Sequence, residues 1–166
     1  MKQVKILVTG PYRAGKSSLI NTMSSGNSFN IDRRGTTVCM DYGYVDVDGV
    51  KLHLFGTPGQ ERFTVIRQIL AEGMRILVMV VDSTKPESIM QAKKIFQELS
   101  PENVPCIIAA NKQDRPEAMS PAEVQKIMNL PRVYTVGTSA TAKNGTHELL
   151  SKLYTVAQVV KPSLPC

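Results

Sequence analysis

A glycine-rich segment near the N-terminus constrains the fold of this chain more than any other feature. The segment spans residues 10–17, reads GPYRAGKS and matches the phosphate-binding pattern G-x-x-x-x-G-K-[ST]. An apolar run over residues 4–8 predicts a strand that leads into it, and residues 17–23 predict a helix that follows it. Strand, loop and helix in this order are the context in which the pattern binds phosphate. A chance turn containing two glycines is the alternative, and this context disfavours it.

Phosphate binding explains the residue types in this loop. Glycines let backbone N–H groups crowd around a polyphosphate, and the amino end of the following helix adds a favourable dipole. The Lys16 ammonium can reach the terminal phosphates, and the Ser17 hydroxyl can bind Mg²⁺. The candidate nucleotide ligands in this region are Gly10, Tyr12, Arg13, Ala14, Gly15, Lys16, Ser17 and Ser18.

A second polar segment, Asn111-Lys112-Gln113-Asp114, indicates which base is bound. It follows an apolar run over residues 106–110, so its side chains are expected at the crevice where open α/β sheets bind ligands. The Asp114 carboxylate can accept hydrogen bonds from N1–H and the exocyclic amine of guanine, whereas adenine would leave this acceptor unpaired. Asn111 would brace the loop, and the aliphatic part of Lys112 would cover the base. A chance polar loop is the alternative, which the position after a buried strand disfavours.

With these segments the chain resembles the Ras-like small GTPases, particularly the Rab and Arf branches and their prokaryotic relatives. Residues 37–42 (TVCMDY) resemble the switch I segment T-I-G-V-D-F of Rab proteins, and residues 56–63 (GTPGQERF) resemble the switch II segment D-T-A-G-Q-E-R-F. Thr138-Ser139-Ala140 resembles the last family motif, in which the backbone contacts the guanine carbonyl; this adds Ser139 and Ala140 to the candidate ligands. Five motifs in the family order make the resemblance specific and extend it over nearly the whole chain.

The resemblance implies a magnesium-dependent switch that hydrolyses GTP to GDP and phosphate. Thr37 would bind Mg²⁺ together with Ser17, and its N–H would contact the γ-phosphate; Thr36 is the neighbouring alternative. Gly59 would contact the γ-phosphate through its N–H, and Gln60 would orient the attacking water. Lys16, Thr37 and Gln60 are therefore the expected catalytic residues, with Arg34 as an additional hypothesis.

Gly56 is the first departure from the family pattern, which has an aspartate at this position to hold Mg²⁺ through water. Asp41 and Asp82 are two carboxylates that would replace it if the fold brings them close. An exposed switch carboxylate and a strand-end cap are the ordinary interpretations of these residues. Pro58 stiffens the backbone before the switch II glycine. Bacterial polarity GTPases of the MglA type are similar in lacking the aspartate and carrying Pro-Gly-Gln.

Tyr12 and Arg13 are the second departure, because Ras itself has glycines there. A tyrosine at this place would crowd an incoming arginine from an activator or cover the phosphates. We therefore expect a changed activator geometry, not inactivity. Arg34 lies three residues before Thr37, the spacing at which Gα subunits carry their own arginine. The hypothesis is that Arg34 stabilises the transition-state charge, with Arg33 and Arg13 as weaker candidates. A solvent-exposed arginine is the ordinary interpretation.

The pattern of the whole chain predicts an α/β fold of the P-loop NTPase type. The expected strands cover residues 3–9, 38–47, 50–56, 75–81, 104–110 and 132–136, and the expected helices cover 16–24, 60–71, 86–99, 120–129 and 145–160. This alternation predicts a six-stranded, mostly parallel sheet with helices on both faces. Asp48-Gly49 predicts a tight turn and hence one antiparallel strand pair. Ser120-Pro121-Ala122-Glu123 predicts a helix start with a capping box.

Length and composition fit a single domain. We expect a GTPase domain over residues 1–161 and a short tail over 162–166 in this chain of 166 residues. Its net charge of +6 permits an anionic partner, but the basic residues are scattered, so no nucleic acid is expected. Cys39, Cys106 and Cys166 are widely spaced, and a cytoplasmic location is the default. Peripheral membrane association is left open, although neither a lipidation box nor an amphipathic anchor supports it.

The expected partners are GTP and GDP, protein effectors, and activating and exchange proteins that contact residues 33–47 and 57–70. We expect the protein itself to be a monomer. The alternative function is a guanine-nucleotide-binding module with little or no hydrolysis, which Gly56 and Tyr12 favour; Thr37, Gln60 and Arg34 favour the hydrolysing switch. A small-molecule kinase on the same loop would need an acceptor site or lid, and the sequence offers neither.

Overall fold

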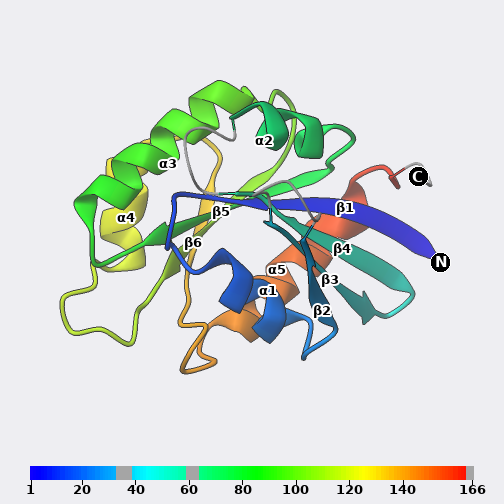
Figure 1. The fold of residues 1–166 in the computed structure, drawn as a ribbon, viewed down its shortest axis with the longest axis horizontal. Helices are drawn as coiled ribbons and strands as arrows, with labels where there is room; N and C mark the ends of the chain where they lie inside the picture. The colour runs from blue at the N-terminus through cyan, green and yellow to red at the C-terminus, as the bar shows by residue number, and fades with distance from the viewer. Residues whose placement is uncertain (33–38, 59–63, 164–166) are drawn as a thin grey trace.

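The computed structural model describes residues 1–32, 39–58 and 64–163, which form one sheet flanked by helices (Figure 1). The strands are β1 (Lys2–Thr9), β2 (Ser28–Asp32), β3 (Cys39–Val47), β4 (Val50–Gly56), β5 (Ile76–Asp82), β6 (Cys106–Asn111) and β7 (Tyr134–Gly137). The helices are α1 (Lys16–Met23), α2 (Thr64–Ala71), α3 (Pro86–Leu99), α4 (Pro121–Met128) and α5 (Thr146–Val159).

The described strands have the order β2-β3-β4-β1-β5-β6-β7 in the sheet. β1 pairs in parallel with β4 and β5, and β6 pairs in parallel with β5 and β7. β3 runs antiparallel to both β2 and β4. β1 therefore lies between β4 and β5, and the chain crosses from one side of β1 to the other between these two strands. The crevice beyond the carboxyl ends of β1 and β5 is the expected ligand site at such a crossing.

The central strands are apolar runs because helices cover both faces of the sheet. All seven residues of β5 are buried. Alternate side chains of this strand enter two separate cores, Ile76 and Val78 one of them and Leu77 and Met79 the other. The first core is completed by α1 and α5, and the second by α3 and α4. Figure 1 shows these two pairs of helices on opposite sides of the sheet.

The predicted fold class is confirmed, and the described strands begin and end close to their predicted bounds. The sheet contains one strand more than predicted, β2, which adds a second antiparallel pairing at the edge. Its sequence SFNID is short, and apolar residues stand at only two of its five positions. A short, polar edge strand carries little signal of its own, because the pairing with β3 forms it. The predicted start of the second helix, at residue 60, lies outside the described residues.

Two local predictions concern the helix start at Ser120 and the chain end. The Ser120 hydroxyl accepts a hydrogen bond from the Glu123 N–H at 3.2 Å, and the Glu123 carboxylate accepts one from the Ser120 N–H at 2.7 Å, which confirms the capping box. Ser163 pairs with β1, since its N–H donates to the Gln3 carbonyl at 2.8 Å. The domain boundary after residue 161 stays a prediction. No helix within the described residues combines the length and apolar character required to cross a bilayer.

Candidate nucleotide site

Three loops meet at the carboxyl edge of the parallel strands. The P-loop (residues 10–17) follows β1, residues 112–114 follow β6, and residues 138–140 follow β7. Because parallel strands end at the same edge of a sheet, these loops are neighbours although they are far apart in the sequence. The predicted phosphate and base ligands of these loops therefore lie in one region.

Close packing fixes the backbone of the P-loop and makes glycine necessary at two positions. Gly10 has a φ of +151°, and a Cβ there would lie 2.1 Å from the Val80 carbonyl oxygen. Gly15 has a φ of +101°, and a Cβ there would lie 2.3 Å from the Asn111 amide nitrogen. Both positions exclude a side chain, so the two glycines of the motif are required by the fold itself as well as by any ligand.

Lys16 lies at the first position of α1, with its side chain folded back over the loop. Its ammonium donates to the Gly10 carbonyl at 2.8 Å and to the Pro11 carbonyl at 2.7 Å. Burial lowers the pKa of Lys16 to about 8; the charge of Arg67 adds to this lowering, and the carboxylate of Asp41 opposes it. A buried ammonium bound to neutral carbonyls favours the arrival of an anion, because the anion would stabilise its charge.

Asn111 joins all three loops. Its amide nitrogen donates to the Ala14 carbonyl at 2.9 Å, and its amide oxygen accepts from the Thr138 hydroxyl at 3.1 Å and from the Ala140 N–H at 3.3 Å. The side chain is 2% exposed. Asn111 thus braces the loops, because it connects the P-loop to residues 138–140.

Lys112 adds a second connection between the loops. Its ammonium donates to the Arg13 carbonyl at 2.9 Å and to the Asp82 carboxylate at 2.8 Å. The Asp82 carboxylate also accepts from the N–H and the hydroxyl of Thr84. Burial alone would raise the pKa of Asp82, but the hydrogen bonds from Lys112 and Thr84 outweigh it and hold the pKa below its ordinary value. Asp82 is therefore an ionised carboxylate whose partners are protein groups.

Asp114, the predicted ligand of the base, is exposed. The Ser139 hydroxyl donates to one of its carboxylate oxygens at 2.7 Å, and this bond is the main reason that the pKa of Asp114 lies below its ordinary value. The Ser139 oxygen in turn accepts from the Ala142 N–H at 3.2 Å, which orients the hydroxyl. Ser139 thus has a side-chain role that the sequence analysis missed, because that analysis considered only its backbone.

Ser17, the predicted magnesium ligand, has a partner on a different element. Its hydroxyl donates to the Asp41 carboxylate, which belongs to β3. The predicted ligand Ser18 is the next exposed residue of the same first turn. Arg67 of α2 is a further functional candidate that the sequence did not single out: it is 2% exposed and donates to the Pro58 carbonyl and the Glu98 carboxylate.

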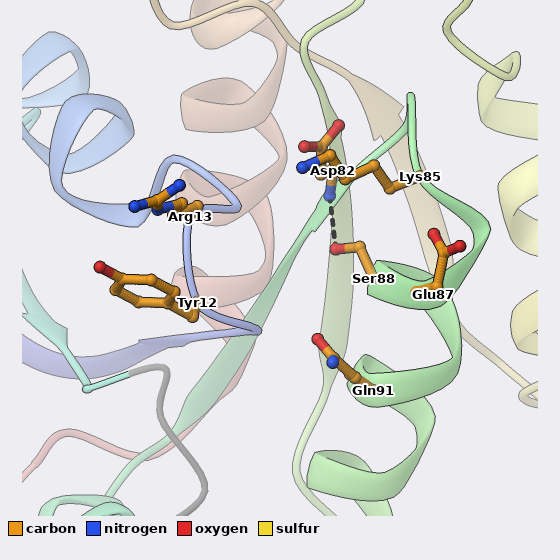
Figure 2. A pocket seen from close by; sticks show the side chains of 7 residues that line it. All are labelled: Tyr12, Arg13, Asp82, Lys85, Glu87, Ser88 and Gln91. Carbon is orange, nitrogen blue, oxygen red and sulfur yellow. Dashed lines mark hydrogen bonds between the residues drawn. The ribbon is translucent and has the colours of Figure 1, made fainter.

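A cavity of about 580 Å³ lies between the P-loop and the start of α3. Figure 2 shows Tyr12 and Arg13 on one side of it, and side chains from the end of β5 and from α3 on the other side. Tyr12 is 57% exposed, and the Arg13 guanidinium lies 5.1 Å from the centre of its ring. The bulky pair therefore stands at the open surface of the loop, where an incoming side chain would meet it.

Four predicted residues, Arg34, Thr37, Gly59 and Gln60, lie outside the described residues, as does the alternative Thr36. Their roles stay predictions. The predicted residues that the structure brings together are those of the P-loop, the Asn111–Asp114 segment and the Ser139–Ala140 pair. Motifs alone could not predict the contacts of Asp41, Asp82 and Arg67, because each contact joins segments that are distant in the sequence.

The chain matches the ADP-ribosylation factor family over residues 1–157. It belongs to this family. The match confirms the predicted membership in the Ras-like small GTPase superfamily, whose members are GTP-binding proteins with a P-loop. GTPases of this superfamily generally use Mg²⁺ with the nucleotide.

Relatives of known sequence agree with this assignment. The chain is 30% identical over 151 residues to an uncharacterized protein of Methanocaldococcus jannaschii, covering 91% of this chain and 95% of that protein. This member of the ADP-ribosylation factor family is also 30% identical over 166 residues to translation initiation factor IF-2 of Thermotoga sp. strain RQ2. That match covers 93% of this chain but only 24% of the initiation factor.

Solved structures show the same fold. The G domain of the T. maritima FeoB iron transporter superposes with a TM-score of 0.74 at 24% identity, covering 94% of this chain and 99% of that domain. The cytosolic domain of the same transporter, in a GDP form, gives a TM-score of 0.76 at 23% identity and covers 99% of this chain and 67% of that domain. At this level of sequence identity, the similarity to these structures shows the fold alone.

Proposed function

We propose that this protein is a guanine-nucleotide-dependent switch that binds GTP and GDP with Mg²⁺ and slowly hydrolyses GTP. The observation that carries the proposal is the connection made by Asn111, which joins the loop bearing Lys16 to the loops bearing Asp114 and Ser139. Phosphate-binding and base-binding groups thus belong to a single braced site, as one nucleotide requires.

On the base side, we assign guanine to the Asp114 carboxylate. It is ionised at neutral pH, because hydrogen bonding from Ser139 holds its pKa low, and it is open to a ligand. A carboxylate can accept hydrogen bonds from the two adjacent donors of guanine, N1–H and the exocyclic amine. Adenine offers no such pair of donors. The backbone of Ser139 and Ala140 completes the base side of the proposal.

On the phosphate side, Lys16 and the N–H groups of the P-loop and of Gly59 would bind the polyphosphate. Ser17 and Thr37 would hold Mg²⁺; the Ser17 hydroxyl and the carboxylate beside it form a set of hard oxygen donors, which fits the preference of this ion. The bound ion would neutralise phosphate charge. Gln60 would orient the attacking water, and release of residues around Thr37 after hydrolysis would make the change of state.

Protein effectors and regulators are proposed to contact residues 33–47 and 57–70. Within the described part of this surface, Val65 and Ile69 of α2 are 65% and 59% exposed. Exposed apolar side chains on one helix fit a protein partner. The alternative, a binding module without hydrolysis, has the same nucleotide site and differs only in turnover.

The nucleotide specificity is tested by competition. A fluorescent GDP analogue bound in the presence of Mg²⁺ is displaced by unlabelled GTP, GDP or ATP. We expect displacement by GTP and GDP at concentrations at least about 10³-fold below those needed for ATP, because ATP leaves the site's polar groups unpaired. Equal displacement by ATP and GTP would contradict the assignment of Asp114.

The pH dependence of binding tests the role of Lys16. Its pKa is about 8 in the free protein, and a polyphosphate favours the charged form and raises that pKa. Binding therefore takes up a proton when the pH exceeds the free-state pKa, and affinity falls as the pH rises. We expect an affinity loss of about threefold between pH 7.5 and 8.5. Calorimetry in buffers of different ionisation enthalpy measures the proton uptake, and its absence at pH 8.5 would contradict this role.

Arg34 is tested by substitution. If its guanidinium stabilises the transition-state charge, Arg34→Ala is expected to slow single-turnover GTP hydrolysis by about 10²- to 10³-fold without an activator, the size of a typical lost electrostatic contact. The affinity for GDP is expected to change little, because GDP carries no transferring phosphate. Arg33→Ala, which removes the weaker candidate next to it, is compared under the same conditions. Hydrolysis by Arg34→Ala at the wild-type rate would remove Arg34 from the catalytic set.

A further inference from the structure

The contact between Ser17 and Asp41 joins α1 to β3, which lies two strands away from β1 in the sheet. Ser17 lies in the first turn of α1, next to Lys16, and its hydroxyl donates to the Asp41 carboxylate on β3. A hydroxyl whose hydrogen is donated to a carboxylate has its lone pairs free to point elsewhere. The contact therefore prepares the Ser17 oxygen to bind a cation while Asp41 adds negative charge beside it.

Packing at the end of β4 explains why Asp41 reaches this position. Asp41 is paired with Gly56 in the antiparallel β3–β4 register. A Cβ on Gly56 would lie 2.7 Å from the end of the Ile20 side chain and 3.0 Å from the Asp41 Cβ. The glycine thus leaves the space between the sheet and α1 to Ile20 and Asp41. Because Gly56 on β4 has no side chain, the Asp41 side chain on β3 has room beside it.

Asp82 is the other carboxylate at this edge of the sheet, and its contacts assign it a different task. It accepts hydrogen bonds from Lys112 and from Thr84, which hold the loop after β6 and the turn after β5. Its negative charge is paired with the Lys112 ammonium at 2.8 Å. Asp41, in contrast, faces the hydroxyl of a predicted metal ligand.

We propose that Asp41 is the positioning carboxylate of the magnesium site: it orients the Ser17 hydroxyl toward the ion and makes that oxygen a stronger ligand, a task for which Gly56 has no side chain. This inference rests on the proposed function, because it concerns Mg²⁺ bound together with the nucleotide. It places the carboxylate on β3 rather than at the end of β4. Asp41 acts through Ser17, so it is a positioning residue and not a catalytic one.

The test measures how Mg²⁺ retains nucleotide in an Asp41→Asn variant. The dissociation rate of a fluorescent GDP analogue is followed while the free Mg²⁺ concentration is varied, and again with excess EDTA. We expect Asp41→Asn to raise the Mg²⁺ concentration needed for half-maximal retention by about 10- to 100-fold, as for other groups that orient a metal ligand. With EDTA the variant and the wild type are expected to release GDP at the same rate.

Asp48→Asn is the matched control, because it removes the same charge from the exposed turn at the far end of the β3–β4 hairpin. It is expected to keep the wild-type Mg²⁺ dependence. A second comparison uses Ser17→Ala: since Asp41 acts through Ser17, adding Asp41→Asn to Ser17→Ala is expected to change the Mg²⁺ dependence by less than about threefold. Thermal unfolding of each variant shows whether it is folded.

Two results would overturn this inference and leave the proposed function intact. One is a folded Asp41→Asn variant with wild-type Mg²⁺ dependence; the other is a variant that releases GDP faster with EDTA by the same factor as with Mg²⁺, which indicates a structural role. A wild-type protein that binds no guanine nucleotide would instead overturn the proposed function, and this inference with it.

Discussion

Replacement of Asp114 by asparagine is expected to lower the affinity for GTP by roughly 10²- to 10⁴-fold, because two charge-assisted hydrogen bonds of about 1.5–3 kcal/mol each are lost. The carboxylate offers only acceptors, and the Ser139 hydroxyl already occupies one of its oxygens. An asparagine can turn an NH₂ donor toward the guanine amine, which leaves two donors facing each other.

The same substitution should change the base preference as well as weaken binding. Xanthine has a carbonyl where guanine has its exocyclic amine, so an NH₂ donor at residue 114 is complementary to it. We expect Asp114→Asn to bind xanthosine triphosphate more tightly than GTP, measured by competition with a fluorescent nucleotide. Glu117→Gln, which neutralises an exposed carboxylate in the same loop, should leave both affinities unchanged. A variant that keeps the wild-type preference for GTP would contradict the assignment of the base site.

Replacement of Asn111 by alanine is expected to lower the free energy of unfolding by about 3 kcal/mol, because buried groups left unpaired cost about 1–3 kcal/mol each. The groups affected are the Ala14 carbonyl, the Thr138 hydroxyl and the Ala140 N–H. Denaturant unfolding without nucleotide measures this loss separately from any effect on binding.

Asn21→Ala provides the comparison for this stability measurement. The Asn21 side chain accepts one hydrogen bond, from the exposed Ser28 hydroxyl, so its loss should cost less than about 0.5 kcal/mol. If Asn111→Ala is no more destabilising than Asn21→Ala, the three loops are held together by other contacts. The bracing role assigned to Asn111 would then be wrong.

The parts of the fold that could be predicted from the sequence are those with strong local signals. The P-loop glycines, the apolar runs of β5 and β6 and the capping box at Ser120 each indicate their own structure without reference to distant residues. β2 lacks such a signal, since it is a short edge strand formed by pairing with β3. The predicted sheet therefore lacked this one strand.

The contacts of the site were predictable only where a motif specifies them. The strand order explains why Asn111 lies close to the P-loop, because both lie at the carboxyl edge of the parallel strands. The sequence could not decide between Asp41 and Asp82, because their partners depend on the β3–β4 register and on the turn after β5. Similarly, a motif names Ser139 but does not say that its hydroxyl orients Asp114.

Single-turnover hydrolysis of bound GTP with excess Mg²⁺ tests whether this protein hydrolyses GTP, as we propose. Wild type and Gln60→Leu are compared, with ATP as the control substrate. We expect slow hydrolysis of GTP by the wild type, no hydrolysis of ATP, and loss of turnover in Gln60→Leu. Tight binding of GTP with no turnover by the wild-type protein would contradict the claim and would favour a guanine-nucleotide-binding module instead.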